Sequence, residues 1–278
     1  MTVTTTRTLD RDSLPMILWA KAKKLGVWNP ADIDLEKDRD DWLELTGQER
    51  ETLLHLTTLF AGGEEAVTVD LLPLISVIAA EGRIEEEVYL TSFLWEEAKH
   101  VDAFHRFLTE VTGDPGDRER FHSPSYRALF FDELPRALNK LREDASPAAQ
   151  ARASVTYNLI VEGVLAETGY HAYHAMLERN AIMPGMLEMI ARLKTDESRH
   201  IAYGVHLLSR LVEAHGEDIW MAIQARMAEL LPLAIGVISE IFDRYDEMAF
   251  GLDLAEFTDF ATAQFESRFK RIERASSR

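Results

Sequence analysis

The 278-residue sequence contains no cysteine. This absence excludes disulfide bonds, thiolate zinc sites, cysteine-held iron–sulfur clusters and cysteine nucleophiles.

Positive charge and long apolar runs are also scarce. The chain has 30 Lys and Arg against 48 Asp and Glu, which gives a formal net charge of −18. Such a surface repels phosphate backbones and anionic lipid, so we expect no nucleic-acid partner. The apolar runs at residues 71–80 and 230–238 are too short to cross a bilayer, and residues 1–12 lack the apolar core of a secretory signal. We expect a cytoplasmic protein without a membrane span.

Hydrophobic residues make up 46% of the chain and recur at helical spacing, and no stretch alternates convincingly with period two. Thr46 and Glu49 form a capping box that opens a helix to about residue 80, which Gly82 ends. Ser146 and Pro147 open another helix, to about residue 180. Further helices are expected over residues 84–111, 125–141, 184–214, 218–248 with a kink at Pro232, and 254–272; a turn is expected at 113–116. No linker divides the chain, so residues 1–278 are predicted to form a single all-α domain, a bundle of long helices.

Two segments share a pattern that carries chemistry: EEAKH at residues 96–100 and DESRH at residues 196–200. Each contains Glu-x-x-His, which places a carboxylate and an imidazole on one helix face, where both can reach one metal ion. A third copy, Glu119 with His122, follows a Pro-Gly turn and is interpreted as a chance match. The pattern alone is weak evidence, because chance also produces it.

Two further glutamates strengthen the pattern. Glu64 lies 18 residues before Gly82 and Glu97 lies 15 after it, so an antiparallel hairpin places both at about the same height. The second half of the chain repeats the spacing less closely, with Glu162 at 22 residues before Pro184 and Glu197 at 13 after it. One Glu from each of two helices plus Glu-x-x-His from each of two others is the dinuclear carboxylate arrangement of ferritin-like bundles. The six predicted metal ligands are Glu64, Glu97, His100, Glu162, Glu197 and His200.

Neighbouring residues extend this hypothesis. Glu96 and Asp196 each precede a ligand glutamate, and such acids often accept the second N–H of a ligand histidine. Tyr157 precedes Glu162 by about 1.4 turns, and spacing alone favours an ordinary core tyrosine. The histidines without a comparable partner pattern are interpreted as structural or exposed: His55, His105, His171, His174, His206 and His215.

At these residues the sequence resembles the ligand-binding oxidases that are related to the ribonucleotide reductase small subunit. The resemblance runs from about residue 28 to residue 234, and its most specific pieces are AGGEEAVT (61–68), EEAKH (96–100), ASVTYN (153–158) and DESRH (196–200). It implies a ferritin-like fold and a dinuclear manganese/iron site, with a di-iron site as the alternative. One departure is the pair Gly62-Gly63, where a single glycine is expected; two could loosen or bulge the helix beside Glu64.

The resemblance also implies roles for individual residues. Glu64, Glu97 and His100 would hold manganese, and the iron side is implied to be Glu162, Glu197 and His200. When dioxygen reacts, an ether cross-link is implied between Val67 and Tyr157, which reverses the interpretation of Tyr157 drawn from spacing. Further implications are a long-chain fatty acid bound beside the metals, with its carboxylate on them, and a homodimer.

Three other functions stay open. A radical-generating reductase subunit commonly has a tyrosine four residues after the first ligand histidine, where this chain has Phe104, and a redox tyrosine in its tail, whereas residues 257–278 contain no Tyr or Trp. A ferritin-like metal store belongs to a different class and is usually a much shorter chain. A desaturase or N-oxygenase relative shares the same ligand pattern.

Overall fold

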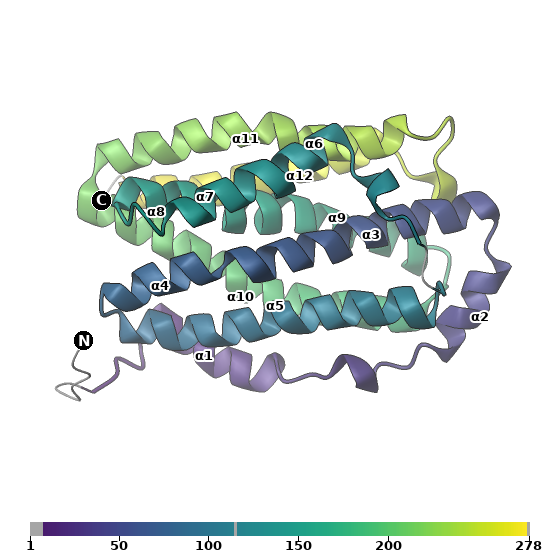
Figure 1. The fold of residues 1–278 in the computed structure, drawn as a ribbon, viewed down its shortest axis with the longest axis horizontal. Coiled ribbons are helices and arrows are strands. Elements are labelled where there is room, and N and C mark those ends of the chain that lie inside the picture. Colours follow the sequence, from purple (N-terminus) through teal and green to yellow (C-terminus); the bar gives the residue numbers. More distant parts are fainter. Residues whose placement is uncertain (1–7, 114–115, 277–278) are drawn as a thin grey trace.

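All regular structure in the computed structural model, which describes residues 8–113 and 116–276, is helical, and the all-α prediction is confirmed. The long helices run roughly parallel or antiparallel to one another (Figure 1). The α-helices are α1 (Leu14–Leu25), α2 (Glu36–Glu44), α3 (Gly47–Asp70), α4 (Leu72–Ala80), α5 (Ile84–Glu110), α6 (Pro124–Arg127), α7 (Leu134–Lys140), α8 (Pro147–Ser154), α9 (Glu167–Tyr173), α10 (Pro184–His215), α11 (Glu217–Asp243) and α12 (Leu254–Ser276). Shorter 3₁₀ or π segments are η1 (Pro30–Asp32), η2 (Glu119–Phe121), η3 (Ala128–Glu133), η4 (Val155–Ala166), η5 (His174–Glu178) and η6 (Ala249–Gly251).

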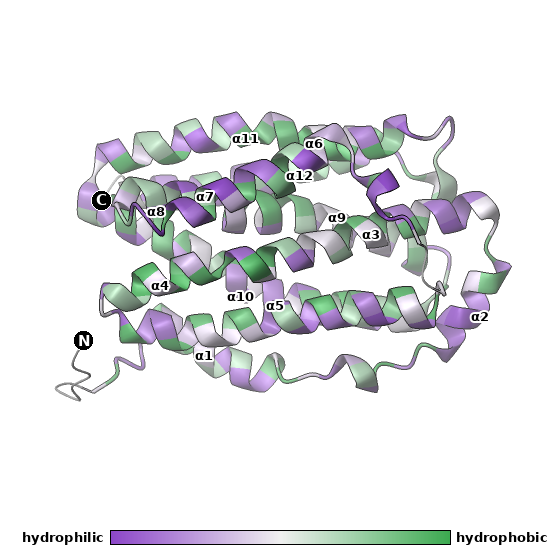
Figure 2. Ribbon diagram, in the orientation of Figure 1, coloured by the Kyte–Doolittle hydropathy of each residue, from purple (hydrophilic) through white to green (hydrophobic). Residues whose placement is uncertain are grey.

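Two antiparallel helix pairs form the centre of the fold. The first pair is α3 with α5, and the second is the η4 segment with α10. Helix α1 packs on α5 and α10, and helices α11 and α12 pack on η4 (Figure 1). Hydropathy differs between the short helices: α4, which buries one face, is almost wholly apolar, whereas the peripheral helix α2 is mostly hydrophilic (Figure 2).

Helix α3 begins as predicted, because the Thr46 hydroxyl accepts a hydrogen bond from the Glu49 amide while the Glu49 carboxylate accepts one from the Thr46 amide. Two expectations about its course were wrong. The helix does not run unbroken to residue 80 but ends at Asp70, and α4 restarts just before Pro73, which cannot donate a helical hydrogen bond. The helix also shows no bulge at Gly62.

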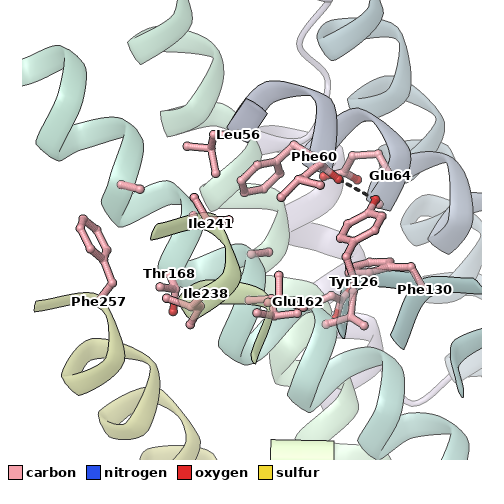
Figure 3. A pocket seen from close by; sticks show the side chains of 18 of the residues that line it. Leu56, Phe60, Glu64, Tyr126, Phe130, Glu162, Thr168, Ile238, Ile241 and Phe257 are labelled. Atoms are coloured by element: carbon pink, nitrogen blue, oxygen red, sulfur yellow. Dashed lines mark hydrogen bonds between the residues drawn. The ribbon is translucent and has the colours of Figure 1, made fainter. Parts of the chain in front are cut away.

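The pair Gly62-Gly63 instead gives room to neighbouring rings. A methyl group on Gly62 would lie 2.8 Å from the Tyr126 hydroxyl, and one on Gly63 would lie 3.3 Å from the Phe130 ring. The Tyr126 hydroxyl occupies this space because it donates a 2.9 Å hydrogen bond to the Leu59 carbonyl (Figure 3). Close packing, rather than a distorted helix, explains the two glycines.

The segment predicted as one helix from Ser146 to about residue 180 is helical throughout. The Ser146 side chain caps its start by accepting a hydrogen bond from the Ala149 amide. Two stretches of it, η4 and η5, are π-helices, which the apolar periodicity did not indicate. A π turn widens the helix by one residue and occurs often at functional sites. Segment η4 carries Tyr157 and Glu162, so the widening lies where the site was predicted.

The N-terminal helices α1 and α2 were not predicted. Helix α2 holds the start of α10, because the Asp38 carboxylate accepts hydrogen bonds from the amides of Gly185 (2.9 Å) and Met186 (2.7 Å). Asp41 accepts from the amide of Met183, which has a left-handed φ of 51°. These side chains supply the cap that α10 lacks in its own sequence.

Helix α11 ends at Asp243, five residues earlier than expected, and contains Pro232 without an interruption. Among the described residues it is the one helix that is long and apolar enough to cross a membrane by length and composition, with a mean hydropathy of 1.5. Core helices of globular proteins pass the same test, and α11 packs against η4, α12, α6 and α8. Of the predicted turn at 113–116, residues 114 and 115 lie outside the described residues.

Candidate metal centre

The four central elements bring the six predicted ligands to one buried place. Helix α3 contributes one glutamate, η4 another, and α5 and α10 each contribute a Glu-x-x-His pair. Every one of these side chains belongs to a residue that is at most 5% exposed. The residues are Glu64, Glu97, His100, Glu162, Glu197 and His200.

The six side chains form two overlapping groups. Within each group, one ligand atom per residue lies within 4.8 Å of the others. The first group is Glu64, Glu97, His100 and Glu197, and the second is Glu97, Glu162, Glu197 and His200. Glu97 and Glu197 therefore lie between the two positions, rather than belonging to one side each.

The imidazole nitrogens fix the two positions. His100 Nδ1 lies 3.5 Å from Glu64 Oε2 and 3.4 Å from Glu197 Oε1. His200 Nδ1 lies 3.0 Å from Glu97 Oε1 and 3.5 Å from Glu162 Oε1. This donor set, four carboxylates and two imidazoles in two adjacent clusters, suits two divalent ions such as iron or manganese.

The hydrogen bonding of these side chains supports the same fit. Buried polar atoms are nearly always hydrogen-bonded. Several buried polar atoms have no hydrogen-bond partner among the described residues, and six of these are ligand atoms of the two clusters. They are both carboxylate oxygens of Glu97, one oxygen each of Glu162 and Glu197, and Nδ1 of His100 and His200. Atoms left in this way are those that a metal ion would coordinate.

Burial and mutual repulsion shape the charge of the site. Burial raises the pKa of Glu64 to about 8, although His100 opposes the shift, and burial together with the Glu197 charge raises the pKa of Glu162 well above its usual value. The pKa of Glu197 shifts in the opposite direction. Burial opposes its ionisation, but the nearby His200 and His100 lower its pKa to about 2. Four carboxylates in one dry cavity repel one another, and two divalent ions would neutralise them.

A second layer of acids holds the two imidazoles. His100 Nε2 lies 3.2 Å from Asp196 Oδ2, and His200 Nε2 lies 2.9 Å from Glu96 Oε2. Each acid therefore serves the histidine of the other helix. Since the acids engage Nε2, the rings present Nδ1 to the clusters, which is the orientation that a metal ligand needs.

Three residues that the sequence did not indicate complete this layer. Trp28 Nε1 donates to Asp196 at 2.8 Å, and Lys99 Nζ lies 2.9 Å from the same carboxylate oxygen. Arg199 pairs with Glu96 at 2.6 Å and also contacts Asp196. Lys99 and Arg199 stand inside the two motifs, and helical spacing could have suggested them. Trp28 is 168 residues from Asp196, and only the tertiary fold reveals its role.

Asn158 is a further residue that was missed. Its amide donates to Glu162 Oε2 at 2.9 Å and accepts from the Ser154 hydroxyl at 2.9 Å. The remaining oxygen of Glu162 faces His200. The i, i+4 spacing of Asn158 and Glu162 was the available signal.

An apolar pocket opens from the clusters between α3, the η4–α9 segment, α11 and the start of α12 (Figure 3). Glu64, Glu97, Glu162 and Glu197 are part of its lining, and leucine, isoleucine, valine and phenylalanine make up most of the rest. Val67 lies in the lining, and Tyr157 is fully buried with a hydroxyl that has no hydrogen-bond partner in the described part of the chain. Burial and the charges of Glu97 and its neighbouring glutamates raise the pKa of Tyr157 well above its usual value.

The other predicted residues lie away from the centre. Glu119 is exposed in η2, and His122 stacks on Tyr126, so this third Glu-x-x-His pair takes no part. The remaining six histidines belong to neither cluster, and His171, for example, pairs with Glu256 on α12 at 2.8 Å. Phe104 is fully buried.

The sequence model of the family described as "Ribonucleotide reductase, small chain" matches residues 16–273. Solved structures agree. An R2-like ligand-binding oxidase with an aerobically reconstituted Mn/Fe cofactor is 37% identical, with a TM-score of 0.92 and 96% of each chain covered. A substituted form of an R2-like ligand-binding oxidase with an Fe/Fe cofactor is 36% identical, with a TM-score of 0.91 and 95% of each chain covered.

Proposed function

Because the chain belongs to the ribonucleotide reductase small-chain family, and within it to the R2-like ligand-binding oxidases, we propose that it is a dioxygen-activating oxidase with a dinuclear centre. The observation that carries the proposal is the convergence of six unpartnered ligand atoms beside an apolar pocket. Relatives with Mn/Fe and with Fe/Fe cofactors support either metal pair, and manganese/iron is the pair proposed here.

The ligands divide between the two ions. Glu64 and His100 would hold the manganese side, and Glu162 and His200 the iron side. Glu97 and Glu197, assigned by resemblance to one side each, have oxygens facing both imidazoles, so bridging is the role their geometry supports. When bound, two reduced ions would supply two of the four electrons that convert dioxygen to water. Asp196 and Glu96 would keep the imidazoles in place by accepting hydrogen bonds from their Nε2–H groups.

The other two electrons would come from the protein in a first turnover. A C–H bond of Val67 and the O–H bond of Tyr157 would break, a C–O ether bond would form between them, and two electrons and two protons would pass to dioxygen. The other two protons needed to form water would come from solvent. Tyr157 suits this role because its hydroxyl is buried and has no hydrogen-bond partner among the described residues. Val67 is one helical turn beyond Glu64 and lines the same pocket.

The pocket suits a long-chain fatty acid or a similar apolar ligand. Its walls are mostly aliphatic and aromatic, and the charged groups in its lining are the four glutamates of the metal clusters. A carboxylate head would bind the two cations there, and the alkyl chain would extend along α3. Removing the chain from water supplies the affinity.

Intact mass and peptide mapping test the oxidase directly. The apoprotein is loaded with iron and manganese without oxygen, divided, and one half is exposed to air. The aerobic half is expected to lose two hydrogens and to yield one linked peptide containing Val67 and Tyr157. Tyr157→Phe and the anaerobic half are the controls. A metal-loaded, air-exposed sample that keeps both hydrogens would contradict the cross-link.

The reductase and storage alternatives have simple tests. Phe104 leaves no tyrosine at the position that commonly carries the radical, and residues of the C-terminal helix α12 pack against α10 and α11. Stimulation of nucleotide reduction by a matching large subunit would favour the reductase. Uptake of far more than two ions per chain would favour storage. The predicted homodimer, single domain and cytoplasmic location are proposed alongside the oxidase function.

A further inference from the structure

The apolar pocket is small for the ligand proposed to occupy it. Its cavity volume is about 120 Å³. An apolar cavity of about 150 Å³ holds one benzene molecule, and a long-chain fatty acid has well over twice the carbon atoms of benzene. A wall of the pocket must therefore move when such a ligand enters.

The walls differ in how firmly they are held. Helix α3 carries Glu64 and the η4 segment carries Glu162, so a shift of either wall would separate the metal ligands. The connection between α11 and α12, residues 244–253, is different. It contributes Met248 and Leu252 to the lining, yet none of its residues is buried. This connection can move without disturbing either cluster.

Polar contacts hold the connection beside the first half of α3 (Figure 1). Gln48 donates a hydrogen bond to the Glu247 carbonyl, and the Tyr245 hydroxyl lies 3.1 Å from His55 Nδ1. The backbone of Phe250 has a left-handed φ of 60°, which is strained for a bulky residue. Segments with few buried contacts open at a lower free-energy cost than the core, so this is the wall expected to open first.

We propose that residues 244–253 are the entrance of the pocket. The connection moves away from α3 to admit the alkyl chain and then closes, so that Met248 and Leu252 pack against the bound ligand. This proposal rests on the proposed function, because it takes a long-chain fatty acid as the ligand. Neither α11 nor α12 contributes a side chain to the two clusters, so the carboxylate can reach metal ions that are already in place.

The absence of cysteine makes a selective test possible. In Gln48→Cys/Glu247→Cys, a short bismaleimide ties the connection to α3 before the delipidated protein is loaded with metal. Uptake of a fluorescent dansyl fatty acid is then followed by stopped flow. The tether is expected to slow uptake at least about tenfold relative to the same variant without the cross-linker.

A second tether is the matched control. Arg152 and Glu229 lie 3.0 Å apart on the surface between α8 and α11, and neither lines the pocket. The same cross-linker in Arg152→Cys/Glu229→Cys is expected to leave uptake unchanged. If the tether between positions 48 and 247 also leaves uptake unchanged, the entrance is overturned and the oxidase proposal stands. If the fatty acid does not bind the untethered, metal-loaded protein, both the entrance and the fatty-acid ligand are overturned.

Discussion

The two buried imidazoles depend on acids that do not touch the clusters themselves. Because Asp196 and Glu96 each accept from Nε2, a neutral histidine must leave Nδ1 unprotonated toward the clusters. The adjacent position of an acid and a ligand glutamate was readable from EEAKH and DESRH. The sequence could not show that each acid hydrogen-bonds to the histidine of the opposite helix, because a motif does not specify which residue of another helix it contacts.

At the residue scale, Glu96→Gln tests this positioning role. The substitution keeps the shape but removes the charge that holds His200 and pairs with Arg199. Metal affinity is expected to fall by about 10- to 100-fold, measured by competition with a chromogenic chelator. Glu119→Gln is the matched control, because it alters the exposed Glu-x-x-His copy. Equal affinities for the two variants would contradict the role.

His55 gives a prediction about pH. Burial, assisted by the charge of Arg244, lowers its pKa to about 4 from the usual 6.5. Between these values the unfolded chain binds a proton that the folded chain does not, so this contribution to stability is complete above pH 6.5 and is lost as the pH falls toward 4. At pH 5 the loss is about 2 kcal/mol.

Denaturant unfolding at pH 7 and pH 5 measures this contribution. The fall in unfolding free energy between the two pH values is expected to be about 2 kcal/mol smaller in His55→Gln than in the wild type. His215→Gln, at an exposed histidine, is expected to behave as the wild type does. An unchanged pH dependence in His55→Gln would contradict this assignment.

At the scale of elements, the strongly periodic helices were predictable, and the local departures from them were not. The Thr46 capping box and the Ser146 cap each depend on a few adjacent residues, and both lie where the sequence predicted them. Residues 155–164 of the π-helix η4 are all buried, so its apolar residues show no spacing that could distinguish a π-helix from an α-helix in the sequence. Helices α1 and α2 depend on tertiary partners, as the bonds of Asp38 to the start of α10 illustrate.

The contact between η4 and α10 is testable through Gly204. A methyl group there would lie 2.2 Å from Asn158 Cβ, so Gly204→Ala must push η4 away and move the residue that holds Glu162. Unfolding free energy is expected to fall by about 1–3 kcal/mol, together with the iron content of reconstituted protein. Gly47→Ala is the control, because nothing lies within 4 Å of its added methyl group. Wild-type iron content in Gly204→Ala would contradict the positioning of Glu162 through Asn158.

At the scale of the whole molecule, the net charge of −18 includes four glutamates buried together in the core. Composition could exclude thiolate chemistry and anionic partners, but it could not say which acids are buried. Folding this cluster without cations leaves its repulsion uncompensated, so metal binding should stabilise the fold.

Calorimetry measures that coupling. At a free metal concentration about 100 times the dissociation constant, each site is expected to add about 2.7 kcal/mol to the unfolding free energy, and chelation is expected to lower the melting temperature accordingly. Glu97→Gln, which alters a glutamate shared by both clusters, is expected to lose most of this dependence. A melting temperature that is indifferent to metal in the wild type would contradict the coupling.

Anomalous diffraction at the manganese and iron edges, from crystals of the full chain reconstituted in air, tests the metal centre most directly. Two peaks are expected a few ångströms apart, one beside Glu64 and His100 and the other beside Glu162 and His200, with Glu97 and Glu197 between them. Crystals of fully metal-loaded protein that give no peak at these side chains, or place the ions elsewhere, would contradict it.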